Sequence, residues 1–309
     1  MEPGSGPAKG PKVPLVKVGP VKERVHVAQD LRSIVVGYDG SDEAAAAVRW
    51  AARHARATAC PLLVVHCSLW PLLTRHLGPV PGVSGSGLEQ SAQSILDEGV
   101  AHAAAEVQGL EVGSTLLHGL PAQHLAGISA GEKMLVVGSR GLGGFLGLLV
   151  GSVSLELAAT ASCPVAVIRH NLHPDGPIVA AVDASGSPSA LGDACVLATA
   201  SNARLTVVHV RHQPPGYRQP AGQDAAAGAQ KVLTEAVRRA GALAPALSVD
   251  GRLLTDSSIP HAILQAAENA RIVVMGSQGR GILRETIGST AHAVLHHAHG
   301  PVLISRHGR

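Results

Sequence analysis

Short apolar runs alternate along the chain with longer segments in which apolar residues recur at helical spacing. The first run, residues 33–39 (SIVVGYD), predicts a buried strand, and the Ala-rich segment after it predicts a helix that ends at about Ala57. Between them, Gly40, Ser41 and Asp42 predict a turn and a helix cap. The pattern continues with predicted strands over residues 61–67, 110–117, 134–138 and 164–168, and with predicted helices over residues 89–108, 121–130 and 151–161.

The second half of the chain repeats the first. Residues 35–41 (VVGYDGS) return as residues 179–185 (VAAVDAS), and residues 136–141 (VVGSRG) return as residues 274–279 (VMGSQG). Two further strand segments, 63–66 and 163–168, return in the same order as 206–209 and 300–304. The chain is therefore expected to be a tandem protein.

Five strands that alternate with helices in each half predict an α/β fold of two tandem doubly wound, Rossmann-like domains, each a five-stranded parallel sheet flanked by helices. We expect the domains at residues 31–170 and 177–309, with residues 171–176 as the linker. Residues 1–30 hold five Lys and Arg against three acidic residues, and their five prolines disfavour a helix. We expect a flexible basic extension there, with a tether for an acidic partner as the alternative.

The composition suits compact α/β domains, because 46% of the 309 residues are hydrophobic, 15% are charged and the net charge is +3. Only 2% are aromatic, which disfavours nucleic-acid binding because bases would have little to stack on. No apolar run approaches the roughly 18 residues of a membrane span, and the N-terminus lacks the hydrophobic core of a signal peptide. The four cysteines form no C-x-x-C pair and are expected to be buried packing groups. We therefore expect a cytoplasmic protein that binds neither nucleic acid nor membrane.

The most distinctive segment is residues 134–154 (MLVVGSRGLGGFLGLLVGSVS), which predicts a strand, a glycine-rich loop and the start of a helix. Glycine lets backbone N–H groups approach a ligand that a Cβ atom would hold off, and N–H groups at a helix N-terminus bind phosphate. The segment is not a P-loop, because the chain contains no Gly, four residues, then Gly-Lys-Ser/Thr. It does not fit the dinucleotide fingerprint either, since Leu146 stands where a glycine or alanine is needed.

The spacing Gly138, two residues, Gly141, nine residues, Gly151–Ser152 resembles the nucleotide motif of the universal stress protein family, in its ATP-binding branch. The resemblance covers both halves. It implies a stress-response regulatory protein that binds ATP with Mg²⁺ and whose nucleotide occupancy controls conformation or partner binding. It also implies that Asp39 lies near adenine and ribose, whereas the residues alone equally allow a turn or capping role. The residues that it implies for the first site are Gly37, Asp39, Gly138, Ser139, Arg140, Gly141, Leu142, Gly143, Gly144, Gly151, Ser152 and Val153.

The second half departs from this motif. Gly276, two residues, Gly279 is intact, but eight residues instead of nine separate Gly279 from Gly288–Ser289. Ala181 and Ala184 also replace the two glycines that flank the strand-end aspartate of the first half. We therefore expect a second, weaker ATP site. Its residues would be Asp183, Gly276, Ser277, Gln278, Gly279, Arg280, Gly281, Gly288, Ser289 and Thr290.

Seventeen histidines raise the possibility of a metal site. The densest group is His296, His297 and His299, but adjacent histidines on a helix point apart and no carboxylate or cysteine stands nearby in the sequence. We therefore expect no metal site. His66 and His209 end matching predicted strands, and we favour hydrogen-bonded structural histidines over ligands there.

Arg140 and Arg280 lie inside the glycine loops and could pair with phosphate, with solvent or with a neighbouring carboxylate, and we favour phosphate for Arg140. No nucleophile elbow and no paired carboxylates at helical spacing accompany the loops, so we do not expect a dedicated enzyme. The alternatives are a slow ATPase or autophosphorylating kinase that uses the same pocket, and an interaction module that has lost its nucleotide. Residues 301–304 predict an edge strand whose free backbone groups could pair with another copy. We therefore expect a homo-oligomer, most simply a dimer, that acts on a regulatory protein partner of unknown identity.

Overall fold

The computed structural model of the protein describes residues 32–70, 85–142, 150–170, 173–214, 223–277 and 286–306. The expected basic extension, residues 1–30, lies outside these ranges. The first half contains, in chain order, β1 (Ile34–Gly37), α1 (Asp42–Ala57), β2 (Leu62–Ser68), α3 (Gly85–Glu106), β3 (Val112–His118), α4 (Pro121–Ile128), β4 (Met134–Gly138), α5 (Ser152–Thr160) and β5 (Val165–Ile168).

The second half repeats this order of elements. It contains β6 (Ile178–Val182), α6 (Pro188–Ser201), β7 (Leu205–His212), α7 (Gln223–Leu243), β8 (Val249–Asp256), α8 (Ile259–Ala266), β9 (Ile272–Gly276), α9 (Ser289–His297) and β10 (Val302–Ser305). Within each half all neighbouring strands are parallel, in the order β3-β2-β1-β4-β5 and its equivalent β8-β7-β6-β9-β10. The predicted α/β fold of two tandem doubly wound domains is confirmed.

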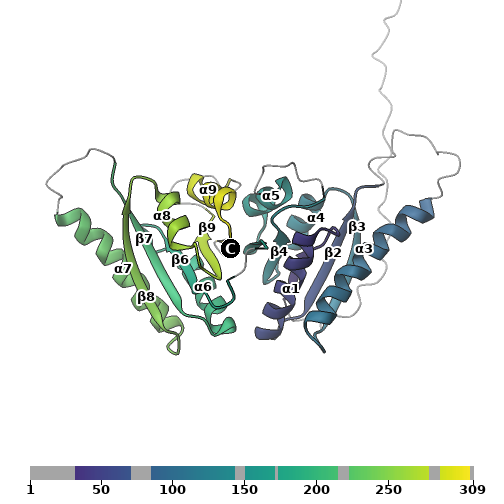
Figure 1. Ribbon diagram of the computed structural model, residues 1–309, viewed down its shortest axis with the longest axis horizontal. Helices are drawn as coiled ribbons and strands as arrows, with labels where there is room; N and C mark the ends of the chain where they lie inside the picture. Colours follow the sequence, from purple (N-terminus) through teal and green to yellow (C-terminus); the bar gives the residue numbers. More distant parts are fainter. Residues whose placement is uncertain are drawn as a thin grey trace, which may run out of the picture.

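The two sheets join into one ten-stranded sheet, because β5 pairs with β10 in antiparallel fashion, with Ala166 opposite Leu303. Figure 1 shows the two halves on either side of this junction, with α1 and α6 facing each other across it. The expectation that residues 301–304 form a free sheet edge is wrong. Val302, Leu303 and Ile304 are fully buried, and among the described strands the edges of the sheet are β3 and β8. The homo-oligomer that we expected therefore loses its supporting argument, because this strand already has two partners within the chain.

Helices cover both faces of the sheet, and side chains alternate between the faces along each strand. On β1, Ile34 and Val36 belong to the core beneath α1, α3, α6 and α7, whereas Val35 belongs to the core beneath α4, α5, α8 and α9. Each core contains residues of both halves. Since burying one large aliphatic side chain contributes about 1.5–3 kcal/mol, these shared cores hold the halves together. Among the described helices, none has the length and apolar character needed to cross a membrane.

Two arginines connect the halves in a symmetric way. Arg169 follows β5, is 6% exposed and donates to the carbonyl oxygens of Leu295 and Gly300 in the second half. Arg306 follows β10 and donates to the carbonyl oxygen of Ala161 at 2.6 Å and to that of Ala159 in the last turn of α5. Helix C-termini leave carbonyl groups without partners, and each arginine supplies donors to the helix of the opposite half. Burial lowers the pKa of Arg169 to about 10, so the side chain stays protonated at neutral pH.

Replacing either of these arginines by methionine is expected to lower the free energy of unfolding by about 2 kcal/mol. The aliphatic volume is kept, but the helix carbonyl groups lose charged donors whose hydrogen bonds contribute roughly 1.5–3 kcal/mol. Urea denaturation of Arg169→Met and Arg306→Met measures the loss. Arg252→Met, on the exposed edge strand β8, makes the same change at a surface position and should alter stability by less than about 0.5 kcal/mol. Equal stability of all three variants would contradict the role of the two arginines.

Candidate functional site

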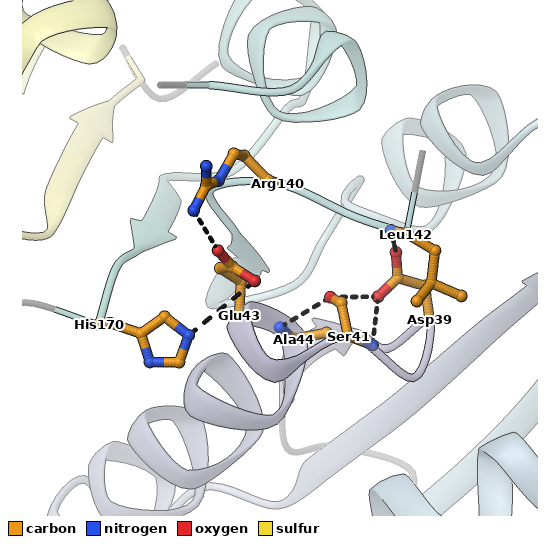
Figure 2. A network of polar contacts seen from close by, with 7 residues as sticks. All are labelled: Asp39, Ser41, Glu43, Ala44, Arg140, Leu142 and His170. Atoms are coloured by element: carbon orange, nitrogen blue, oxygen red, sulfur yellow. Dashed lines mark hydrogen bonds and ion pairs between the residues drawn. The ribbon is translucent and has the colours of Figure 1, made fainter. Parts of the chain in front are cut away.

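Asp39 and the glycine loop meet at the carboxyl edge of the sheet. Asp39 follows β1 and the loop follows β4, and the strand order reverses between these two neighbours. Open α/β sheets bind their ligands at such a reversal. Asp39 Oδ2 accepts a hydrogen bond from the backbone N–H of Leu142 at 3.1 Å, as Figure 2 shows. Leu142 is 73% exposed, so this contact lies at the protein surface.

The other oxygen of Asp39 organises the start of α1. Asp39 Oδ1 accepts hydrogen bonds from the backbone N–H of Ser41 at 3.1 Å and from its hydroxyl at 2.6 Å. The same hydroxyl accepts from the N–H of Ala44 at 3.2 Å and thereby caps the helix. Gly40, between them, has a φ of +87°, a conformation that favours glycine. Asp39 therefore performs the turn role that the residues alone allowed and also contacts the loop.

Three of the predicted site glycines stand where a Cβ atom would crowd a neighbour. A Cβ on Gly141 would lie 2.3 Å from Asp39 Oδ2, and one on Gly138 would lie 2.8 Å from the carbonyl carbon of Glu43 in α1. A Cβ on Gly37 would lie 3.1 Å from a leucine side chain of α4. Close approach, rather than positive φ, therefore favours glycine at positions 138 and 141, whereas a side chain at position 37 would need the leucine to shift by a few tenths of an ångström.

Backbone hydrogen bonds fix both ends of the loop. The N–H of Ser139 donates to the carbonyl of Ile168 at 2.8 Å, and the N–H of Gly151 donates to the carbonyl of Ser139 at 2.7 Å. The hydroxyl of Ser154 donates to the carbonyl of Gly138 at 2.8 Å. The start of α5 is thus held directly against the end of β4, and the two ends of the loop meet.

The N-terminus of α5 begins at a glycine. Gly151 is its N-cap residue, and among the described residues no side-chain hydrogen bond caps the helix there. Ser152 and Val153 form the first turn, and Ser152 is exposed. Because first-turn N–H groups have no partner inside the helix and carry partial positive charge, this end of α5 can bind phosphate.

Arg140 forms an ion pair with Glu43 of α1, with Nη2 at 2.7 Å from Oε1. His170 Nε2 lies 3.9 Å from the other oxygen of Glu43 (Figure 2). Burial opposes ionisation of Glu43, but the hydrogen bond and charge of Arg140 hold its pKa below the usual value. Of the three partners that we considered for Arg140, the structure shows the neighbouring carboxylate. Sequence reasoning missed Glu43, and only its position in the first turn of a helix at the ligand edge could have indicated it.

In the second half, Asp183 accepts hydrogen bonds from residues of the turn that follows it. Asp183 Oδ1 accepts from the N–H of Ser185 at 2.8 Å, from the hydroxyl of Ser185 at 2.5 Å and from the hydroxyl of Ser187 at 3.1 Å. Burial opposes ionisation, but these donors hold the pKa of Asp183 below its usual value. The N-cap residue of α6 comes four residues after the aspartate, since α6 begins at Pro188, whereas that of α1 comes two residues after Asp39.

The ends of the second loop match those of the first. After β9 ends at Gly276, the N–H of Ser277 donates to the carbonyl of the last residue of β10 at 3.1 Å. The N–H of Gly288 donates to the carbonyl of Ser277 at 2.8 Å. Gly288 is the N-cap residue of α9, again without a side-chain cap, and Ser289 and Thr290 form the first turn. The second loop therefore closes in the same way and presents a similar helix N-terminus.

Comparison with known proteins identifies the family. The profile of the universal stress protein family matches residues 31–169 and again residues 176–306. The chain belongs to the universal stress protein family. Universal stress protein Rv2005c of Mycobacterium tuberculosis is 34% identical over 287 residues, which cover 88% of this chain and 96% of that protein. Universal stress protein Rv2623 of the same organism is 31% identical over 291 residues, with the same coverage of both chains.

A solved structure has the same fold. The crystal structure of a universal stress protein from Archaeoglobus fulgidus superimposes with a TM-score of 0.66 at 20% identity. The superposition covers 90% of this chain and 97% of that one. The fold of this universal stress protein is therefore shared over nearly the full length of both chains.

Some predicted site residues of this universal stress protein lie outside the described ranges. These residues are Gly143, Gly144, Gln278, Gly279, Arg280 and Gly281.

In the described part of the second half, the residues with a left-handed backbone near Asp183 are Gly186 (φ +76°) and Ser187 (φ +41°), and Ala184 is not one of them. The replacement of glycine by Ala184 therefore carries no strain, because the longer turn places its left-handed residues elsewhere.

His66 of β2 and His209 of β7 have the structural role that we favoured. His66 Nδ1 lies 2.8 Å from the carbonyl oxygen of Tyr38, and His209 Nδ1 lies 2.9 Å from that of Val182. Both side chains are buried. In the ranges that the structure describes, no three His, Cys, Asp or Glu residues gather closely enough to hold a metal ion. Three of the free cysteines are buried as expected, and the fourth, Cys67, is half-buried.

Proposed function

We propose that the first half of this universal stress protein binds ATP with Mg²⁺, and that nucleotide occupancy controls its conformation or its binding to a regulatory protein partner. The observation that carries the proposal is the hydrogen bond from the N–H of Leu142 to Asp39 Oδ2. It joins the strand-end carboxylate to the glycine loop at the point where the strand order reverses. Gly141 leaves no space between them for a side chain, so this contact depends on the motif glycine.

The uncapped N-terminus of α5 supports a triphosphate in this loop. Its first-turn N–H groups and partial positive charge favour a negatively charged group beside Ser152. Mg²⁺ would neutralise phosphate charge and would be held by phosphate oxygens together with oxygen ligands such as the exposed hydroxyl of Ser152. Adenine and ribose would then lie on the side of Asp39.

The ion pair between Arg140 and Glu43 supports a link from the loop to the junction of the two halves. Arg140 belongs to the loop, and Glu43 also lies 3.9 Å from His170. His170 is the chain neighbour of Arg169, which donates to carbonyl groups of the second half. A phosphate that attracts Arg140 away from Glu43 would therefore disturb residues next to the junction.

Denaturing the purified protein and identifying the small molecules that it releases tests the proposal. We expect an adenine nucleotide, in close to one copy per chain. A preparation that releases no nucleotide and also fails to bind added Mg-ATP would contradict the proposal and support the interaction module instead. Phosphate release from bound ATP over hours, abolished in the Gly141→Val variant, would instead favour the slow ATPase or autophosphorylating kinase.

A further inference from the structure

A cavity of about 380 Å³ lies between the two halves, at the edge of the sheet opposite the glycine loops. Ile178 and Ile272, the first residues of β6 and β9, line it at the amino edge. The C-terminal parts of α1 and α6, which face each other in Figure 1, contribute the side walls. Cavities at domain interfaces and of a few hundred Å³ are typical of small-molecule sites. The fold therefore contains a second space for a ligand that the nucleotide proposal does not use.

One wall of the cavity is flat and aromatic. The rings of Trp50 and His54 on α1 stack with centroids 5.1 Å apart and planes at 27°. Burial lowers the pKa of His54 to about 4, so its ring is neutral at pH 7. Leu197 and Ala200 of α6 add aliphatic surface. An aromatic ring in the cavity could stack on this wall in an offset or edge-to-face geometry.

The charges that line the cavity are positive. Among the described residues that line it are Arg53 and Arg271 and no Asp or Glu. Arg53 is neutralised by Glu106, with Nη1 at 2.5 Å from Oε1. Arg271 Nη1 donates to the carbonyl of Ser201 at 3.0 Å, and in the described part of the chain no carboxylate lies within ion-pair distance of it. Its Nε is shielded from solvent and has no hydrogen-bond partner among the described residues.

We propose that this cavity binds a small aromatic carboxylate, whose ring packs against Trp50 and whose carboxylate pairs with Arg271. Arginine matches the planar geometry of a carboxylate, and a charge-assisted hydrogen bond is strong in a partly buried site. The carboxylate balances the charge that the lining leaves uncompensated, and the ring fills the apolar volume. Because both halves supply walls, the bound molecule contacts α1 and α6 together.

Calorimetric titration of the full chain with 2-naphthoate and with the neutral 2-naphthalenemethanol tests this site. We expect naphthoate to bind and the alcohol to bind at least about tenfold more weakly, because it lacks the charge-assisted contact. Arg271→Gln should weaken naphthoate binding at least about tenfold. Arg252→Gln makes the same charge change on the exposed strand β8 and should bind naphthoate as the wild type does.

A second variant tests the location independently of charge. Ala200→Trp introduces bulk from α6 into the cavity and should abolish naphthoate binding while leaving Mg-ATP binding unchanged, since the glycine loops lie at the opposite edge. Circular dichroism tests whether each variant is folded. If Arg271→Gln is unfolded, naphthoate binding by Ala200→Trp alone tests the location of the site. Equal affinity for naphthoate and the alcohol, or full naphthoate affinity in Ala200→Trp, would overturn the proposal. So would displacement of naphthoate by Mg-ATP in direct competition.

Discussion

Replacing Gly141 by valine is expected to lower the affinity for ATP at least about a hundredfold. The new Cβ would lie 2.3 Å from Asp39 Oδ2, far inside van der Waals contact, so the Asp39 side chain and the loop must separate. That separation breaks the hydrogen bond from Leu142, and the loop loses the contact that holds the N–H groups that would face the phosphates. Hydrogen bonds to charged oxygens contribute about 1.5–3 kcal/mol each, and losing two of them gives a factor of about one hundred or more. Calorimetric titration with Mg-ATP measures the change.

Gly127→Val provides a matched control. Gly127 is an exposed residue of α4, and a Cβ atom there meets nothing within 4 Å. The substitution makes the same chemical change without touching Asp39 or the loop, so ATP affinity should stay within about twofold of the wild type. If Gly141→Val binds ATP as tightly as Gly127→Val does, the loop is not the phosphate site.

Most of the fold could be predicted from the sequence because parallel strands covered on both faces are continuous apolar runs. Residues 134–138 were predicted as a strand and form β4, and the helix predicted to end at about Ala57 does end there. Strand ends were less accurate. The run over residues 33–39 yields only the four residues of β1, because Ser33 precedes the strand and Tyr38 and Asp39 follow it, with Asp39 hydrogen-bonded to the start of α1.

The joining of the two sheets could not be predicted from the same pattern. A short apolar run such as residues 301–304 looks the same whether it lies inside a sheet or at its edge, because both need apolar side chains on the covered faces. What distinguishes them is the pairing of backbone groups, and here β10 pairs with β5 as well as β9.

The partners of long side chains were equally hard to predict. The pairing of Arg140 with Glu43 crosses 97 positions of sequence and depends on which of several acceptors is nearest in the folded chain.

The position of Asp39 could be inferred from topology alone, since the ends of β1 and β4 lie at one edge of the sheet.

The longer turn between Asp183 and α6 could also have been predicted from the sequence. Proline is frequent at the first position of a helix, so Pro188 indicates that α6 begins after a longer turn than the one between Asp39 and α1. The repeat of residues 35–41 as 179–185 concealed this difference, because the matching residues end before the two turns diverge.

Replacing the two strand-end aspartates separately is expected to show that the halves are unequal, with the tight ATP site in the first. Asp39 lies two residues before the N-cap residue of α1 and contacts its glycine loop through Leu142, whereas Asp183 lies in a longer turn, four residues before the N-cap residue of α6. The second loop is also one residue shorter although its two ends meet in the same way, so the segment between them must span the same gap with up to about 3.5 Å less chain. Hydrogen bonds tolerate only a few tenths of an ångström, so that loop must rebuild or lose contacts.

Calorimetry with Mg-ATP on the wild type, Asp39→Ala and Asp183→Ala measures the difference. The wild type should show one tight and one weaker site, since α9 keeps an uncapped N-terminus with Ser289 and Thr290 in its first turn. Asp39→Ala should weaken the tight site at least about tenfold, because the loop loses its anchor and the turn before α1 loses its acceptor. Asp183→Ala should leave the tight site unchanged and alter only the weaker one. Two equal sites in the wild type would contradict the predicted inequality, and loss of the tight site only in Asp183→Ala would show that the second half, and not the first, carries the principal nucleotide.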